Sequence, residues 1–397
     1  SAGCKSGDRV NDIIACLMKS AIYAFSGDPI TFGHLDIIKR AAAVFDRLVV
    51  AIGHNPAKNY LFSQEERTEM AKRSLFDLKN VEVKSFNGML VDFAYENNID
   101  VIVKGVRSNR DFEYEMNLHS LGDSQKLGID TFILFARPSL THISSSAVKE
   151  IQAGQGLIQD YVPAYVKQCL EVKLSGQYIV GLTGEIGSGK SYVGQKLVAF
   201  AKAKGLVAHN IELDHLAWQI QTDLKEDKYT VVRKQIIDTF GLEVANPDGS
   251  INRKMLGEIV FADQKKLKKL NDIMEIPILV RLRRELKNKK GLIFLNAALL
   301  AEAKMSQLSN YNTILLSVDE KIQNQRLSDR DLSRDQIKRR LKSQYDFTSK
   351  KKFLEAEIKQ NQQGKLWVLK NNNAADFEIR ELLEDLLSYF SSIEMGQ

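Results

Sequence analysis

The sequence has few cysteines and no long apolar run, which argues against a disulfide-stabilised or membrane-spanning protein. Cys4, Cys16 and Cys169 are its three cysteines. Their spacing matches neither a metal-binding nor a redox motif, and an odd number cannot all pair within one chain. No apolar run approaches the roughly 20 residues that a membrane span needs. We therefore expect a protein of a reducing compartment, the cytoplasm, with no membrane partner.

The composition is typical of a soluble globular protein, and its length of 397 residues predicts two or three domains at roughly 150 residues each. The net charge of +6 suits anionic ligands such as nucleotides. Two basic runs, residues 265–269 and 287–290, are more typical of solvated helix faces than of a nucleic-acid site. Residues 1–17 lack the pattern of a secretory signal. We interpret residues 1–18 as a native leader or a vector-derived remnant, with Met18 as an alternative start.

The clearest motif is a glycine-rich loop near the middle of the chain. Residues 184–191 match G-x-x-x-x-G-K-S, with an apolar strand before them and an apolar-periodic helix after them. Backbone N–H groups of such a phosphate-binding loop (P-loop) bind a polyphosphate at the positive end of the helix. We predict that Lys190 contacts the β- and γ-phosphates of ATP and that Ser191 ligates Mg²⁺. The predicted nucleotide-binding set here is Gly184, Gly187, Ser188, Gly189, Lys190, Ser191 and Tyr192.

In front of this loop, predicted strands and helices alternate. Strands are expected at residues 21–25, 48–52, 81–83, 101–104 and 131–135, and helices at residues 35–41, 63–76, 89–96 and 109–121. Alternation of this kind predicts an α/β domain with a parallel sheet covered by helices on both faces. Ser63 and Glu66 fit a capping box, which marks one helix start. In such a fold, ligands bind beyond the carboxyl ends of the strands.

Polar and cationic residues occupy the turns after these predicted strands. Ser26 and His34 flank the start of the first helix, where a phosphate would meet the helix dipole. Lys58, the segment 104–107 and the serines 144–146 follow other strands and should lie on the same rim. A single histidine near a helix start is more often structural than catalytic. These neighbours favour the interpretation as a site for a phosphate-bearing ligand.

Residues 20–174 resemble bacterial-type phosphopantetheine adenylyltransferases. The resemblance is carried by residues 26–34, Lys58, 104–115 and 143–150. It implies a Rossmann-like nucleotidyltransferase fold that joins 4′-phosphopantetheine to the AMP part of ATP and releases pyrophosphate. The attacking phosphate oxygen is already anionic at neutral pH, so the reaction needs no general base. Positioning and stabilisation of charge on the α-phosphate suffice.

The same resemblance implies residue roles in the first domain. His34, Lys58 and Arg107 are predicted to be catalytic, and Ser26 and Lys58 to contact the phosphate of the incoming substrate. ATP phosphates are predicted to contact His34 and the serines Ser144, Ser145 and Ser146. The pantetheine arm is predicted to lie along Met89 and Leu90. The predicted binding set also includes Lys104 and Glu115. Two positions depart from the family: Ser26-Gly27 replaces the usual Thr-Phe, and Lys104 replaces an arginine. Lysine keeps the charge but lacks the bidentate fork of arginine.

After the P-loop, residues 206–211 predict a second strand of a new sheet, followed by Asp214. A carboxylate at the end of a neighbouring strand faces the loop. It is placed to orient or deprotonate a substrate hydroxyl or to help hold magnesium. An aspartate just before an apolar helical segment also serves as a helix cap. The spacing alone does not decide between these two roles.

From residue 177 to residue 392 the chain resembles dephospho-CoA kinases. The resemblance is carried by the P-loop, Asp214, residues 248–253, residues 299–302, Arg326, Arg330 and Gln344. It implies a P-loop kinase with a core, a helical substrate segment and a lid, which phosphorylates the ribose 3′-hydroxyl of dephospho-CoA with ATP and Mg²⁺. Asp214 matches the catalytic aspartate, and Arg326 and Arg330 fall on the lid. The acceptor side departs from the family at Trp218, Glu275 and Ala298.

Together the two resemblances predict a bifunctional enzyme of coenzyme A biosynthesis. A first domain at residues 19–174 would make dephospho-CoA, and after a linker at 175–177, a second domain at residues 178–393 would convert it to CoA. The expected ligands are ATP, 4′-phosphopantetheine, dephospho-CoA and CoA, with no nucleic-acid partner and with a homo-oligomer formed through the first domain. One alternative is an active adenylyltransferase fused to a degenerate, regulatory kinase-like domain that binds nucleotide or CoA. A second is a nucleic-acid-binding ATPase.

Overall fold

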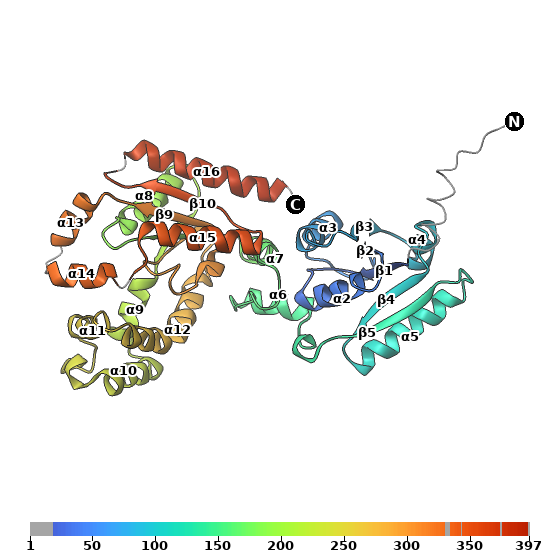
Figure 1. Cartoon of the computed structure of the whole chain (residues 1–397), viewed down its shortest axis with the longest axis horizontal. Coiled ribbons are helices and arrows are strands. Elements are labelled where there is room, and N and C mark those ends of the chain that lie inside the picture. Colours follow the sequence, from blue (N-terminus) through green and yellow to red (C-terminus); the bar gives the residue numbers. More distant parts are fainter. Residues whose placement is uncertain (1–18, 330–333, 343, 374, 396–397) are drawn as a thin grey trace. The chain divides into compact units, whose positions relative to one another are not determined.

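Two compact units, each built on one parallel five-stranded sheet, make up the computed structural model of the chain (Figure 1). The structure describes residues 19–329, 334–342, 344–373 and 375–395. Within these, the first unit comprises residues 19–152, 157–169 and 393–395, and the second comprises residues 153–156 and 170–392. The predicted leader, residues 1–18, and Arg330 lie outside the described residues.

The sheet of the first unit has the strand order β3-β2-β1-β4-β5, and every pairing in it is parallel. Its strands are β1 (Ser20–Phe25), β2 (Arg47–Gly53), β3 (Val81–Phe86), β4 (Val101–Val106) and β5 (Asp130–Phe135). The chain runs outward from β1 to β3 and then crosses back to β4 on the other side of β1. This reversal puts the switch point of the sheet between β1 and β4, which is where such sheets bind ligands.

Helices cover both faces of this sheet, as the alternation predicts. They are α2 (Phe32–Ala42), α3 (Gln64–Ser74), α4 (Leu90–Glu96), α5 (Asn109–Asp123), α6 (Ser145–Ala153) and α7 (Ala164–Leu170). Ile22 and Val49 pack against α4 on one face, while Tyr23 and Val50, which point the opposite way, are buried as well. The capping box at the start of α3 is confirmed, with the Glu66 N–H donating to Ser63 Oγ at 3.2 Å.

The sheet of the second unit has the order β10-β9-β6-β8-β7, also parallel throughout. Its strands are β6 (Gln177–Gly184), β7 (Ala208–Glu212), β8 (Gly291–Asn296), β9 (Thr313–Ser317) and β10 (Leu366–Lys370). Only Gly176 separates β6 from a π-helical turn, Glu171–Ser175, that follows α7. The strand predicted at 206–211 begins two residues later, because Leu206 and Val207 lie in an exposed turn after Gly205.

Nine helices complete the described part of the second unit: α8 (Lys190–Ala203), α9 (Leu213–Gln221), α10 (Asp227–Phe240), α11 (Arg253–Val260), α12 (Gln264–Leu286), α13 (Glu320–Ser328), α14 (Arg334–Lys342), α15 (Phe347–Asn361) and α16 (Asp376–Met395). Helices α9 to α12 gather at one end of the unit (Figure 1), around a core that includes Tyr229, Ile236 and Met274. These helices correspond to the predicted helical substrate segment, and α13 and α14 to the predicted lid. Across the described ranges, no helix is both long and apolar enough to cross a membrane.

Candidate active sites

A cleft of about 810 Å³ lies at the carboxyl ends of β1, β2 and β4, at the switch point of the first sheet. The predicted site residues that line it are Ser26, His34, Lys58, Leu90, Lys104, Arg107, Glu115, Ser144, Ser145 and Ser146. Met89 is not among the lining residues: it is the N-cap of α4, and its side chain is 47% exposed. The fold therefore brings together residues from five segments that are far apart in the sequence.

His34 lies in the first turn of α2 as a neutral hydrogen-bond donor. The Thr31 N–H donates to His34 Nδ1 at 3.0 Å, so the ring proton of the neutral imidazole sits on Nε2. The ring also stacks on Phe25 with a centroid separation of 4.6 Å. Burial, with the positive charge of Arg107 as the smaller cause, lowers the pKa of His34 to about 4. Nδ1 thus serves a structural role at the helix start, which leaves Nε2–H for an anion in the cleft.

Cationic side chains from β4 and the turn after it also line the cleft. Arg107 donates from Nη1 to the Ile143 carbonyl at 3.1 Å and pairs through Nε with Asp111 at 3.2 Å. These contacts hold the guanidinium next to the serine turn that opens α6. Lys104, the residue that replaces the family's arginine, pairs with Glu115 at 2.8 Å, and both side chains are mostly buried. Two residues that were predicted separately as part of the binding set therefore contact each other.

The serine turn at the start of α6 is tied to the turn after β1. Ser144 Oγ accepts the Ala147 N–H at 3.1 Å, and Ser145 Oγ donates to the Pro29 carbonyl at 2.8 Å. Ser146 is exposed at the same helix start. Because the first backbone N–H groups of a helix have no partner within the helix, this turn offers donors to a phosphate.

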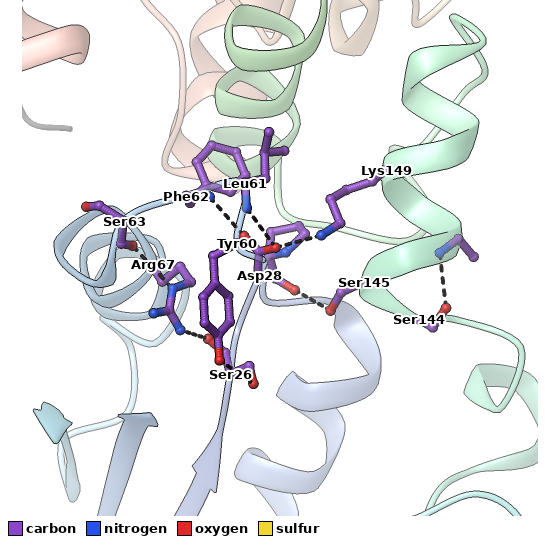
Figure 2. Close-up of polar contacts among 12 residues, drawn as sticks. Ser26, Asp28, Tyr60, Leu61, Phe62, Ser63, Arg67, Ser144, Ser145 and Lys149 are labelled. Atoms are coloured by element: carbon purple, nitrogen blue, oxygen red, sulfur yellow. Dashed lines mark hydrogen bonds and ion pairs between the residues drawn. The ribbon is translucent and has the colours of Figure 1, made fainter. Parts of the chain in front are cut away.

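Sequence reasoning assigned no role to Asp28 or Lys149, which cross-link the base of the cleft (Figure 2). Asp28 is buried, pairs with Lys149 Nζ at 2.6 Å, and accepts the backbone N–H groups of Leu61 and Phe62 at 3.1 and 3.0 Å. One carboxylate therefore joins the turn after β1, the loop before α3 and helix α6. Asp28 lies inside the resembling run 26–34 and Lys149 inside 143–150, so the motif itself was the available signal.

The P-loop of the second unit joins β6 to α8. Gly189 adopts a positive φ of 85°, and a side chain at this position would meet Asn371. Lys190 Nζ donates to the carbonyls of Gly184 and Glu185, both at 3.1 Å, so it reaches across the loop. Ser191 and Tyr192 are exposed in the first turn of α8. Gly184 and Gly187 also have positive φ, so the loop uses backbone conformations that favour glycine.

Side chains from the carboxyl-terminal segments hold the carbonyl groups of this loop. Asn371 Nδ2 donates to the Ser188 carbonyl at 2.7 Å, and Gln323 Nε2 donates to the Ile186 carbonyl at 2.8 Å. Arg326, on α13, donates to the Gly187 carbonyl at 3.3 Å. Three loop carbonyl groups are thus engaged by side chains, and the Ile186 N–H donates to Gln344 Oε1 at 3.2 Å. The predicted lid residue Arg326 thus contacts the loop directly.

Asp214 lies in the first turn of α9, next to the P-loop. The N-cap of that helix is Glu212, so the interpretation of Asp214 as the cap is wrong. The Asp214 side chain is open to solvent but surrounded by protein, and this partial burial raises its pKa. The charges of Lys190 and Arg253 and a hydrogen bond from the Ala298 N–H oppose that shift. A carboxylate with a raised pKa beside Lys190 suits contact with a substrate hydroxyl.

A buried lysine donates a hydrogen bond to the carbonyl of Ala298. Lys350 on α15 is fully buried, and its Nζ lies 2.9 Å from the Ala298 carbonyl and 2.5 Å from Glu302 Oε1. The Tyr345 N–H donates to the same Glu302 oxygen at 2.8 Å. Since proline has no N–H, the alanine at 298 provides a donor to Asp214 that the usual proline lacks.

The other two departures lie on the helical segment. Trp218 stacks on His215 with centroids 5.3 Å apart and rings 17° from parallel, one turn after Asp214. Glu275 is exposed on α12, two residues before the buried Pro277 inside that helix. The basic run 265–269 occupies the same helix, with its lysines exposed.

Comparison with known proteins places both units. A family model described as cytidylyltransferase-like matches residues 26–151, and one described as dephospho-CoA kinase matches residues 178–365. The chain is 41% identical over 158 residues to the phosphopantetheine adenylyltransferase of Clostridium perfringens, a match that covers 40% of this chain and 96% of the relative. For the phosphopantetheine adenylyltransferase of Clostridium tetani the identity is 47% over 146 residues, or 37% of this chain and 91% of the relative. A solved structure of a dephospho-CoA kinase from Campylobacter jejuni covers 55% of this chain and 97% of its own at 19% identity, with a TM-score of 0.29.

Fold, cleft and matches together define a nucleotidyltransferase domain followed by a kinase domain. The relatives of the first domain are matched over almost their whole length, so this domain shows the family. Through this domain the chain belongs to the phosphopantetheine adenylyltransferase family, and its second domain is of the dephospho-CoA kinase type.

Proposed function

We propose that this chain catalyses two consecutive reactions of coenzyme A biosynthesis. The first unit transfers the adenylyl group of ATP to 4′-phosphopantetheine, which gives dephospho-CoA and pyrophosphate. The second unit transfers the γ-phosphoryl group of a second ATP to the ribose 3′-hydroxyl of dephospho-CoA, which gives CoA. The observation that carries the proposal is the presence of both family matches, in this order, in one chain.

In the first reaction, a phosphate oxygen of 4′-phosphopantetheine attacks the α-phosphorus of ATP, and the bond to pyrophosphate breaks. His34 contributes a neutral Nε2–H, which stabilises negative charge without taking part in proton transfer, because its pKa of about 4 keeps it deprotonated at Nδ1. Lys58 and Arg107 add positive charge from two other sides of the cleft. Ser144, Ser145 and Ser146 would hold the ATP phosphates at the start of α6.

In the second reaction, the ribose oxygen attacks the γ-phosphorus of ATP, and ADP leaves. Asp214 would orient the 3′-hydroxyl and accept its proton, a role that its raised pKa supports. Lys190 would leave the carbonyls of Gly184 and Glu185 for the β- and γ-phosphates. Arg326 would contact the same phosphates from α13.

Magnesium fits the oxygen donors of the second unit. The Ser191 hydroxyl is exposed at the start of α8, and Asp214 adds a carboxylate nearby. Mg²⁺ commonly binds through one or two protein oxygens together with substrate phosphates. When bound, it supplies positive charge that offsets the charge of the phosphates.

We also propose that the protein acts in the cytoplasm as a homo-oligomer formed through the first unit. The Cys169 thiol is buried and is not part of a disulfide within the described residues, which suits a reducing compartment. The edge strand β5 and helix α5 expose apolar side chains, among them Leu121, Phe132 and Phe135. Apolar side chains gathered on one edge favour an interface between copies. Light scattering on the purified protein gives the molar mass, and a monomer at micromolar concentration would contradict this part of the proposal.

Separate assays of the two units test the proposal. Dephospho-CoA, ATP and Mg²⁺ should give a 3′-phosphorylated product, which the Lys190→Ala variant should not form. Pyrophosphate release from ATP and 4′-phosphopantetheine should persist in that variant. If the wild-type chain binds dephospho-CoA without phosphorylating it, the second unit is a regulatory module and the proposal for it is wrong.

A further inference from the structure

Arg67, on α3, is a charged side chain buried behind the wall of the cleft in the first unit. It is fully buried and is the largest of the fully buried side chains. All of its hydrogen-bond acceptors are neutral carbonyl groups. Nη1 donates to Ser26 and, at 2.8 Å, to Gly53, while Nε donates to Ser63 at 3.3 Å. Its second terminal nitrogen, Nη2, is buried without a hydrogen-bond partner.

The positive charge of Arg67 is not matched by an ion pair within the described part of the chain. The charges of Asp28 and, to a smaller extent, of the exposed Glu65 act on it through space, but Asp28 already pairs with Lys149 at 2.6 Å. Among the buried or half-buried charges at this point, Arg67, Lys149 and Asp28, the sum is +1, because the one carboxylate faces two cations. Burying an unpaired charge costs several kcal/mol. An arginine cannot avoid this cost by losing its proton, so a bound anion is the natural partner for the excess charge.

Arg67 also contacts two residues of the cleft wall, Ser26 and Tyr60 (Figure 2). Its guanidinium lies 4.1 Å from the centroid of the Tyr60 ring. The Tyr60 hydroxyl accepts the Asn55 N–H at 2.9 Å and lies 3.5 Å from Ser26 Oγ. Ser26, Asn55 and Tyr60 all line the cleft. One buried side chain thus holds the end of β1 by its carbonyl and the loop after β2 by an aromatic ring.

We propose that Arg67 is a positioning residue for the phosphate of the acceptor substrate, a phosphomonoester. From behind the wall it orients Ser26 and Tyr60, and it supplies a positive charge that the bound phosphomonoester neutralises. This inference rests on the proposed adenylyl transfer in the first unit. ATP is expected to bind by the serine turn of α6, so Arg67 should affect the acceptor far more than ATP.

Steady-state kinetics of pyrophosphate release test the inference. In the full-length chain, Arg67→Gln removes the charge, and Arg67→Lys keeps it. Arg73→Gln is the matched control, because Arg73 lies on the same helix, stacks on Tyr165 at 4.2 Å, pairs with Glu69 and does not line the cleft. Arg67→Gln should raise the KM for 4′-phosphopantetheine about tenfold or more and change the KM for ATP less than about twofold. Arg67→Lys should recover most of the loss, and the control should behave as the wild type does.

Three results would overturn the inference in a chain whose wild type is active. They are an equal rise in both KM values, a fall in kcat with an unchanged KM for 4′-phosphopantetheine, and an Arg67→Gln variant indistinguishable from the control. If Arg67→Gln does not fold, the kinetics of Arg67→Lys decide the question. A few-fold rise in the KM for 4′-phosphopantetheine with an unchanged KM for ATP supports the inference. Parallel changes in both KM values contradict it. A wild-type chain that releases no pyrophosphate contradicts the proposed function instead, which keeps the two failures distinct.

Discussion

The buried pair of Lys350 and Glu302 offers a quantitative test of how the second unit holds its candidate catalytic aspartate. Lys350 is fully buried, with Nζ 2.5 Å from Glu302 Oε1 and 2.9 Å from the Ala298 carbonyl. Replacing it by methionine leaves a mostly buried carboxylate with a single donor, the Tyr345 N–H. Breaking one side of a buried ion pair costs about 3–5 kcal/mol, because the remaining charge has no partner. We expect Lys350→Met to lower the free energy of unfolding of the second unit by about that amount.

A second substitution separates the charge from the packing. In Lys350→Met with Glu302→Gln, the glutamine keeps an oxygen for the Tyr345 N–H but carries no charge. Because removal of both charges of a buried pair is often nearly neutral, the double variant should recover most of the lost stability.

Tryptophan fluorescence during urea unfolding measures the stability of the second unit directly. The chain has two tryptophans, Trp218 and Trp367, and both belong to that unit. If the single variant loses less than about 1 kcal/mol, or if the double variant is as unstable as the single one, the pair does not behave as a buried ion pair.

Three further outcomes follow from the geometry of the two sites. Gly189→Ala should abolish phosphorylation of dephospho-CoA, because the position needs a φ of 85° and a side chain there meets Asn371; an active variant would show that the loop tolerates it. His34→Ala should stop pyrophosphate release while kinase output on supplied dephospho-CoA persists, and loss of both activities would contradict independent sites. The pKa of His34 is lowered from 6.5 to about 4 in the folded first unit, so between these pH values the unfolded unit binds more protons than the folded one. The stability of the unit should therefore fall as the pH drops from about 6.5 toward 4, and His34 should not affect it above pH 6.5. Hydrogen exchange of the β1 and β2 amides measures this stability as a function of pH. If the pH dependence is unchanged in His34→Gln, another group is responsible for it.

The sequence predicted the features that depend on local patterns. Strand and helix alternation indicated the first parallel α/β unit, and the strand, P-loop and helix indicated the second. The capping box at Ser63 marked the start of α3, and the residues after the first unit's strands were expected on one rim because parallel strands end at the same edge of a sheet. Most of those residues line the cleft. The P-loop was recognisable because its glycines and lysine are contiguous in the chain.

The contacts that support these sites could not be predicted, because they join residues far apart in the sequence. Arg67 reaches the Ser26 carbonyl across 41 positions, Lys149 reaches Asp28 across 121, and Lys350 reaches Glu302 across 48. A buried arginine or lysine gives no local signal, since charged residues on helices are usually solvated. The departure at Ala298 acquires a meaning only in the folded chain, where the backbone of Ala298 helps to lower the pKa of Asp214.

Mass analysis of a single incubation shows whether one chain converts 4′-phosphopantetheine to CoA in two steps. With 4′-phosphopantetheine, ATP and Mg²⁺, we expect dephospho-CoA to appear first and CoA to follow, while Lys190→Ala accumulates dephospho-CoA and forms no CoA. If the wild-type chain accumulates dephospho-CoA without forming any CoA, the chain does not catalyse the second step.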